Sequence, residues 1–214
     1  MKTALHARRS SSAASAAILL ACLMAMPVQA QPPTARQPSQ AKPPPRAHDP
    51  AATMAAQRQA LARLAFLDGT WRGPARHTTP DGTAHEMIQT ERVGPMLDGT
   101  IRVIEGHGYD ADGTTAFNAF AVLSWNPAQQ AYGMRSYAMG HAGDYAFRPT
   151  EDGFVWEIPA GPATIRYTAT VANGTWHEVG ERIVADKPPQ AFFEMTLQRI
   201  GDSDWPAAGA VPMR

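Results

Sequence analysis

The sequence predicts an all-β protein, an antiparallel up-and-down barrel of about eight to ten strands preceded by one short helix. Turn dipeptides recur at regular intervals from residue 69 onward, and Asx-Gly pairs favour tight hairpin loops because these residues tolerate positive φ. The stretches between the turns are rich in β-branched and aromatic residues, which are typical of strands. A meander of this length closes on itself because closure removes exposed edges. The turn dipeptides are Asp81-Gly82, Asp98-Gly99, Asp112-Gly113, Asn126-Pro127, Asp152-Gly153 and Asn173-Gly174.

Residues 1–30 have the three parts of a secretory signal peptide: a basic start without acids, an apolar stretch over 13–26, and a small-x-small site that ends at Ala30. We therefore expect export to the periplasm or secretion, with cleavage after Ala30. The apolar stretch is shorter than the ~20 residues that span a membrane, so we expect no integral membrane span. The sequence around Cys22 loosely resembles a lipoprotein box, which leaves lipid anchoring at Cys22 as an alternative.

The charge and the cysteine content exclude several classes of protein. The chain has 19 basic and 19 acidic side chains, but residues 61–214 carry 12 basic and 18 acidic ones, a net charge of −6. Such a surface repels phosphate backbones, so we expect no nucleic-acid partner. The single cysteine, Cys22, lies inside the predicted signal peptide. The mature chain would therefore have no disulfide, no thiolate nucleophile and no cysteine-based metal site.

The chain changes character twice before the first predicted strand. Residues 31–50 contain seven prolines, a composition that favours an extended, disordered spacer. Residues 51–66 are strong helix formers, and Leu61, Leu64 and Ala65 lie on one stripe of the expected short helix. We assign residues 51–210 to a single barrel domain with this helix in front of it.

The Asn173-Gly174 turn fixes the pairing of the strands on either side, if it is a two-residue loop. The face with more aromatic and aliphatic bulk then contains Tyr167 and Glu178, so we expect both inside the barrel. The opposed pairs are Val171–Trp176, Ala169–Glu178, Tyr167–Gly180, Ile165–Arg182 and, as an exposed ion pair on the outer face, Arg166–Glu181.

The same reasoning at Asp98-Gly99 places Arg92 opposite Glu105 and Thr90 opposite His107, and we expect these side chains inside as well. A carboxylate that faces the interior must be paired, protonated or hydrated in a cavity. A register slip by one residue would instead put Arg92, Glu105 and Glu178 on the surface. The candidate ligand-binding residues are Arg92, Glu105, His107, Arg135, which could face either way, Tyr167 and Glu178.

The aromatic residues support two interpretations. They could form the cage of a hydrophobic ligand or simply fill the barrel, since eight strands leave room for little more than side chains whereas ten open a larger cavity. Phe193, Met195 and Leu197 alternate with polar residues, so we expect these three inside. The aromatic residues concerned are Phe117, Trp125, Tyr132, Tyr137, Phe154, Trp156, Trp176 and Phe193.

The segment LDGTWRG at residues 67–73, which follows the expected helix, resembles the opening of the calycin-like barrels: lipocalins, fatty-acid-binding proteins and nitrobindin-like haem barrels. Over residues 61–210 the chain is similar to a family of exported bacterial proteins of calycin-like fold with no established activity. The resemblance implies structural roles for two residues: Trp71 closes one end of the barrel, and Arg199 of the last strand stacks across its indole. The further segments that carry it are PMLDGT at 95–100, FNAF at 117–120, RSY at 135–137, WEI at 156–158 and GDSDWP at 201–206.

Familiar catalytic and cofactor motifs are not found in the sequence. It has no Gly-x-Ser-x-Gly elbow, no His-Glu-x-x-His pair and no phosphate-binding glycine loop. An axial haem ligand must be a histidine at one defined place, and the histidines are scattered singly. We therefore expect no cofactor, no metal and no enzymatic activity.

The leading hypothesis is an exported barrel that binds a small apolar or amphipathic molecule. The first alternative is a filled barrel whose surface serves as a structural or envelope-associated interaction module. A barrel enzyme built from scattered residues, such as Glu178 with His107, is the second alternative. The sequence leaves the identity of the ligand and the oligomeric state open.

Overall fold

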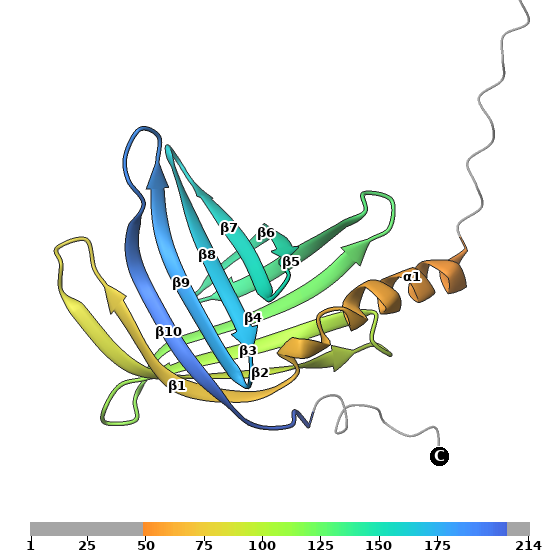
Figure 1. Cartoon of the computed structure of the whole chain (residues 1–214), viewed down its shortest axis with the longest axis horizontal. Helices are drawn as coiled ribbons and strands as arrows, with labels where there is room; N and C mark the ends of the chain where they lie inside the picture. The colour runs from red at the N-terminus through yellow and green to blue at the C-terminus, as the bar shows by residue number, and fades with distance from the viewer. Residues whose placement is uncertain (1–48, 205–214) are drawn as a thin grey trace, which may run out of the picture. The chain divides into compact units, whose positions relative to one another are not determined.

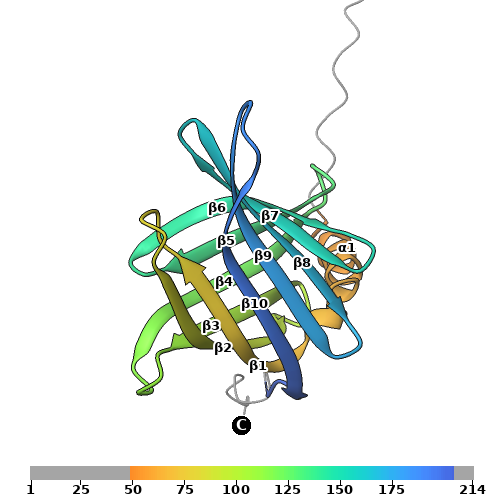
Figure 2. The ribbon, with the colours of Figure 1, turned by 60° about the vertical axis from the view of Figure 1, so that its left-hand side comes forward.

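Ten antiparallel strands form a closed barrel in the computed structural model, which describes residues 49–204 (Figure 1). Each strand pairs with its neighbours in sequence, and β1 pairs with β10 to close the ring (Figure 2). This confirms the predicted all-β, up-and-down barrel. The strands are β1 (Gly69–Thr78), β2 (Ala84–Met96), β3 (Ile101–Tyr109), β4 (Thr115–Asn126), β5 (Ala131–Ala138), β6 (His141–Pro149), β7 (Gly153–Ala160), β8 (Ala163–Ala172), β9 (Thr175–Val184) and β10 (Gln190–Gly201).

The helix before the barrel, α1 (Pro50–Ala62), is shorter than the predicted one and begins one residue earlier. The side chain of Asp49 caps it by accepting hydrogen bonds from two backbone amides, and Pro50 fits the first turn because an N–H there would have no helical partner. A 3-10 turn, η1 (Ala65–Leu67), follows. The predicted signal peptide, Cys22 and nearly all of the predicted spacer lie outside the described residues.

Apolar side chains from α1 and η1 fill one end of the barrel. Leu61 and Leu64 are fully buried, as the stripe of the helix predicts. Ala65 is exposed because α1 ends at Ala62 and the 3-10 turn brings Leu67 inward in its place. On β1, Trp71 is buried beside them, and its indole Nε1 donates a 2.9 Å hydrogen bond to the carbonyl oxygen of Leu67. This end of the barrel is therefore closed by packed side chains.

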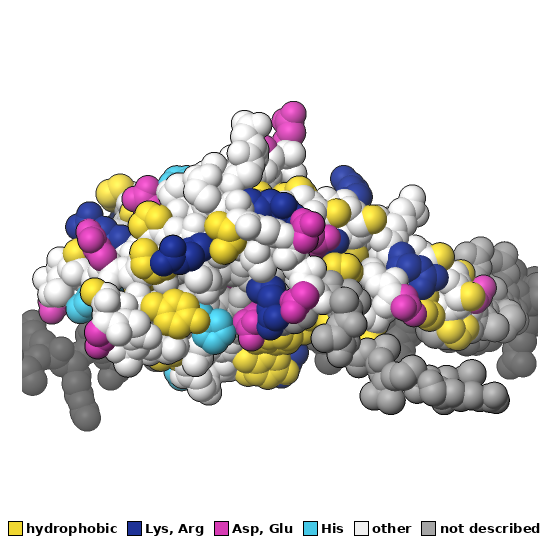
Figure 3. Space-filling model, turned by 90° about the horizontal axis from the view of Figure 1, so that it is seen from below, with side chains coloured by type: hydrophobic (Ala, Val, Ile, Leu, Met, Phe, Trp, Pro, Cys, Tyr) yellow, Lys and Arg dark blue, Asp and Glu magenta, His cyan; other side chains and the backbone are white. Residues whose placement is uncertain are grey.

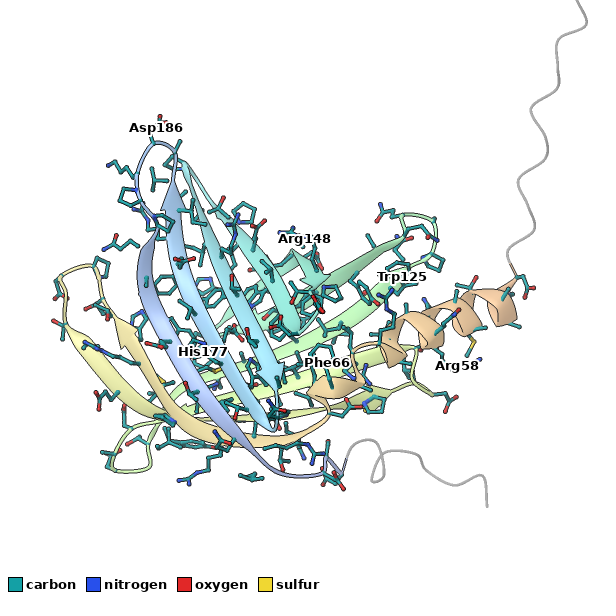
Figure 4. The ribbon with its side chains drawn as sticks, viewed as in Figure 1. Arg58, Phe66, Trp125, Arg148, His177 and Asp186 are labelled. Atoms are coloured by element: carbon teal, nitrogen blue, oxygen red, sulfur yellow. The ribbon has the colours of Figure 1, made fainter. Side chains whose placement is uncertain are left out.

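A buried arginine ties α1 and η1 to the barrel. Arg102 of β3 is 3% exposed, and its Nε and Nη2 donate hydrogen bonds of 2.6 Å and 2.9 Å to the two carboxylate oxygens of Asp68. Its Nη1 donates to the carbonyl oxygen of Leu61. At the far end of β4, Trp125 lies near α1 (Figure 4) and packs edge-on against Tyr132, whose hydroxyl donates to the Ala60 carbonyl at 2.8 Å. The closed end thus combines apolar packing with satisfied polar groups.

The structure places Trp71 at the closed end, as the resemblance implies, but Arg199 does not stack on it. The two residues are opposed in the β1–β10 pairing. The guanidinium of Arg199 instead donates to the carbonyl oxygen of Asp68 at 3.2 Å and to Asp202 at 2.6 Å. It lies over Gly69, where an added Cβ would come within 2.8 Å of Arg199 Nε. The expected cation–π contact is therefore wrong. The carbonyl oxygen of Asp68 and the carboxylate of Asp202 accept hydrogen bonds from the guanidinium and hold it away from the indole.

The turn at Asn173-Gly174 has the predicted register. Asn173 and Gly174 have φ values of 53° and 74°, and all of the expected opposed pairs across β8 and β9 are present. One contact differs from the expectation. Arg166 lies opposite Glu181, but its Nε donates to Glu157 Oε1 of β7 at 2.8 Å. Arg166 has an opposed acid on each side, and it binds the one on β7.

Basic and acidic side chains lie next to each other over the face of the molecule in Figure 3, with apolar side chains between them. In residues 49–204, no helix has both the length and the apolar character needed to cross a membrane.

Candidate ligand cavity

The barrel interior contains a cavity of about 490 Å³, a volume within the range of about 300–1,000 Å³ that is typical of small-molecule sites. At one end it is bounded by Phe154 and Trp176, which pack against the closed end of the barrel. At the other end it is bounded by His77, Phe117 and His141, which lie near the strand ends farthest from the closed end. A barrel of ten strands is wider than one of eight, so its inward side chains need not meet at the axis.

The two sides of the cavity differ in the size of their side chains. Several small residues line the part formed by β3, β4 and β5, beside the larger Ile104, Phe117 and Met134, and they leave room in the interior. Large aromatic residues line the part formed by β6 to β10. The small residues are Gly106, Ala119, Ala121, Ser136 and Ala138. The aromatic residues are Tyr145, Phe147, Phe154, Trp156, Tyr167, Trp176, Phe192 and Phe193.

The aromatic wall is held in place by ring contacts. Trp156 and Tyr167 are opposed across β7 and β8, and their rings stack with centroids 4.3 Å apart and an interplanar angle of 6°. Gly180 of β9 gives the Tyr167 ring its space, because an added Cβ would lie 2.8 Å from Tyr167 Cε1. Phe154 meets Trp176 edge-on at 5.6 Å. These contacts fix the ring orientations before any ligand enters.

Glu178 points into this aromatic wall and is 5% exposed. Its Oε1 accepts a 3.2 Å hydrogen bond from Trp156 Nε1, and its Oε2 accepts a 3.0 Å hydrogen bond from Trp176 Nε1. Burial raises the pKa of Glu178 to about 7, against the lowering effect of the two indole hydrogen bonds. Burial and the charge of Glu178 also raise the pKa of Tyr167. The carboxyl group is therefore partly protonated near neutral pH.

A second carboxyl group, that of Glu91 on β2, also lines the cavity. Its Oε1 accepts a 2.7 Å hydrogen bond from Gln89 Nε2. Gly106 leaves room for it, since an added Cβ would lie 2.7 Å from Oε1. Burial raises the pKa of Glu91 to about 8; the Gln89 hydrogen bond lowers it, and the charges of Glu178 and Glu105 raise it further. Glu91 lies deep in the barrel, yet the side chain is only half-buried because part of it faces the open cavity.

Glu91 is not among the candidate residues predicted from the sequence. The Asp98-Gly99 turn gave the correct pairing of β2 with β3, with Arg92 opposite Glu105 and Thr90 opposite His107. The choice of inner face from apolar bulk was wrong. The inner face contains Glu91 and Gly106, because a cavity needs small residues and space on its wall. The glycine opposite an acidic residue was the sequence signal that could have revealed the inner face.

The expected inward placement of Arg92, Glu105 and His107 is therefore wrong. Arg92 binds Glu105 on the outer face, with Nη2 and Oε2 2.7 Å apart, and both side chains are about one third exposed. His107 Nε2 lies 3.7 Å from Glu105 Oε1 on the same face. Because Glu178 lies inside and His107 outside, the suggested catalytic combination of these two residues is not formed.

Arg135 also faces outward. Its Nη1 lies 2.6 Å from Asp144 Oδ2, and its Nε donates to the hydroxyl of Tyr137 at 3.0 Å. Its neighbour Met134 is buried and lines the cavity, as the alternation of a strand requires. Of the six candidate ligand-binding residues, Tyr167 and Glu178 lie in the cavity.

The aromatic residues divide between the wall, the closed end and the surface. Trp125 and Tyr132 pack near α1, whereas Tyr137 is on the outer surface. The other expected aromatic residues line the cavity, namely Phe117, Phe154, Trp156, Trp176 and Phe193. On β10, Phe193, Met195 and Leu197 point inward, which confirms the expectation for that strand. Aromatic side chains thus fill part of the interior, and the rest of it stays open as the cavity.

The cavity has acidic side chains in its lining but no lysine or arginine. Its lining contains Glu91 and Glu178 and neither lysine nor arginine; His77 and His141 are its histidines. Within the described part of the chain, no group of three or more His, Cys, Asp or Glu side chains could hold a metal ion.

Comparisons with protein-family models and with curated proteins find no match for this sequence. Sixteen chains of solved structures are similar to it. One is the crystal structure of Rv2717c from M. tuberculosis, with a TM-score of 0.51 and 13% sequence identity over 66% of this chain and 97% of that one. At this identity the likeness concerns the fold alone.

Proposed function

We propose that this chain is an exported, non-catalytic barrel that binds a small apolar or amphipathic molecule in its interior. The observation that carries the proposal is the cavity of about 490 Å³ with an aromatic wall and the buried carboxyl group of Glu178. Aromatic side chains supply large apolar contact, and a few placed polar groups orient a ligand.

The distribution of packing supports binding rather than a filled barrel. Leu61, Leu67 and Trp71 fill the closed end completely. The rest of the interior has small residues such as Ala119 and Ser136 where larger ones would fill it. Natural cores have few voids larger than a water molecule, so an interior left open on this scale favours a ligand.

The hydrogen bonds of the two interior acids support a role in binding rather than in catalysis. Glu178 accepts from two indoles, and Glu91 accepts from an amide. A catalytic acid or base is coupled to a nucleophile or to the proton it transfers. The indole and amide partners of these acids do not serve as nucleophiles.

Export is proposed from the sequence of residues 1–30, which has the composition of a signal peptide. The test is the intact mass of the protein recovered from its native cells. A chain that begins at Gln31 supports cleavage after Ala30. A chain that begins at a lipid-modified Cys22 supports the anchored alternative, and an unprocessed chain in the cytosol contradicts export.

The binding proposal is tested with the neutral fluorescent probe N-phenyl-1-naphthylamine. We expect its fluorescence to rise on mixing with the wild-type protein, and the Ala119→Phe variant to abolish the rise because the new ring occupies the cavity. Ala172→Phe is the matched control, since Ala172 is an exposed residue of β8. Native mass spectrometry of protein from its own compartment should also show a mass lost on denaturation. A wild-type protein that binds no probe and carries no such mass would contradict the proposal.

A further inference from the structure

We propose that the ligand is a small organic cation, an amine or a quaternary ammonium compound with an apolar group. This inference rests on the proposed binding function and names the chemical class of the ligand. The geometry that carries it is the juxtaposition of two interior carboxyl groups with an aromatic wall in a cavity whose lining has no lysine or arginine.

The composition of the cavity lining favours a cationic ligand over an anionic one. Glu91 and Glu178 are the acidic groups in the cavity lining, and the other titratable groups of the lining are Tyr145, Tyr167, His77 and His141. An anionic ligand, such as a fatty-acid carboxylate, would find no lysine or arginine in the lining, and the ionised form of either acid would repel it. A cation would supply the counter-charge that the cavity lacks.

The carboxyl group of Glu178 can accept further hydrogen bonds. Each of its oxygens accepts one indole hydrogen bond, and a carboxylate has about four acceptor positions. Both donors are neutral, and the neighbouring His177 lies on the outer face, where it contacts Glu194 at 3.0 Å (Figure 4). An ammonium group in the cavity could therefore donate to Glu178 without displacing either tryptophan.

Aromatic rings surround the carboxyl group of Glu178. Trp156 and Trp176 donate to it, and Tyr167 stacks on Trp156. Aromatic rings attract cations through their quadrupoles, most strongly in places from which water is excluded. A carboxyl group framed by such rings matches both parts of the proposed ligand, the charge and the apolar group.

The protonation of the two acids gives the proposal a further signature. The raised pKa values of Glu178 and Glu91 mean that both groups hold protons near pH 7 for part or most of the time. A bound cation favours the ionised carboxylate, so binding should release protons. Affinity for the cation should accordingly rise from pH 6 to pH 8, whereas affinity for a neutral analogue should not.

The experiment compares three probes of similar size by calorimetry on the full mature protein: 2-phenylethylammonium, n-propylbenzene and 3-phenylpropanoate. We expect the cation to bind about tenfold more tightly than the neutral analogue, and the anion most weakly. The Glu178→Gln variant should remove the preference for the cation. Glu91→Gln should weaken it, and Glu86→Gln, an exposed acid of β2, should leave it unchanged.

The outcomes separate this inference from the proposed function. If n-propylbenzene binds as tightly as the cation, or the anion binds best, the cavity remains a binding site and the assignment to cations is overturned. If N-phenyl-1-naphthylamine and all three probes fail to bind, both proposals are overturned. Because the comparison of probes is made on the wild-type protein, it holds even if a Glu178 variant does not fold.

Discussion

Trp176 and Glu178 lie two residues apart on β9 and both point into the barrel, where Trp176 Nε1 donates a 3.0 Å hydrogen bond to Glu178 Oε2. The alternation of a strand puts both residues on one face. The same indole therefore forms part of the cavity wall and anchors the carboxyl group. Trp156 holds the other oxygen from β7, so the Glu178 carboxyl group is fixed both from its own strand and from β7.

Replacing one of these indoles should raise the pKa of Glu178. The Trp156→Phe variant removes the hydrogen bond to Oε1, and hydrogen bonds to the ionised form are what hold this pKa down against burial. A carbon-13 NMR titration of the glutamate carboxyl groups would follow the change. Trp125→Phe is the control, because Trp125 packs against Tyr132 at the closed end. An unchanged or lower pKa in Trp156→Phe would show that the indole does not stabilise the carboxylate.

The stability of the protein should fall as the pH rises from about 4.5 to about 8. Glu178 and Glu91 have pKa values of about 7 and about 8 in the folded protein, above the ordinary value of 4.5. The folded state therefore binds more protons than the unfolded state in this window, and stability decreases with pH. A pKa raised from 4.5 to about 7 corresponds to about 3 kcal/mol.

Urea unfolding at pH 5 and pH 8 would measure this effect. Glu178→Gln and Glu91→Gln should each flatten the dependence, because a glutamine does not titrate. Glu86→Gln should not, since Glu86 is exposed on the same strand as Glu91. A wild-type protein that is equally stable at both pH values would mean that the folded state does not raise the pKa values of the two acids.

The closed end depends on Arg102. Arg102→Met should lower the free energy of unfolding by about 2–3 kcal/mol, because it leaves the Asp68 carboxylate and the Leu61 carbonyl without their shared donor. The partial exposure of Asp68 limits the loss. Arg72→Met, at an exposed position of β1, should change stability by no more than about 0.5 kcal/mol. Equal effects in urea unfolding would show that the buried ion pair does not fasten α1 and η1 to the barrel.

Turn residues explain how much of the fold could be predicted from the sequence. The turns at Asp98-Gly99 and Asn173-Gly174 each fix a strand pairing by local conformation alone, and both predicted registers are present. Local conformation says nothing about which face points inward. That choice succeeded at β8 and β9, where the inner face has the aromatic bulk, and failed at β2 and β3, where the inner face is made of Glu91 and Gly106.

Contacts between distant parts of the chain could not be predicted. Arg102 reaches Asp68 and the carbonyl of Leu61, 34 and 41 residues away. Nothing in the sequence distinguishes Arg102 from the other polar residues on the predicted strands. Arg199 likewise turns to Asp68 and Asp202 rather than to Trp71. Such choices depend on where acceptors lie in the folded barrel, and the alternation of residues along a strand does not contain that information.

Gly180 should not be replaceable by a larger residue without a loss of stability, because the aromatic wall lies directly against it. Gly180→Ala would place a Cβ 2.8 Å from Tyr167 Cε1 and 3.0 Å from Phe193 Cβ. Tyr167 cannot retreat freely because its ring stacks on Trp156 and meets Phe192 and Phe193 edge-on. We expect a loss of about 1–3 kcal/mol, as for other overpacked sites. Because the ring must move, we also expect a changed tryptophan fluorescence spectrum.

Gly133→Ala is the matched control for this substitution. Gly133 lies within β5, and an added Cβ would meet only Ser124 Oγ at 3.7 Å, an ordinary contact distance. Neither glycine has a positive φ, so the two substitutions differ in the space they meet and not in backbone strain. We expect Gly133→Ala to keep the stability within about 0.5 kcal/mol and the spectrum unchanged. If both variants lose equal stability, the cost comes from replacing a strand glycine in general, and the Tyr167 ring does not depend on the space above Gly180.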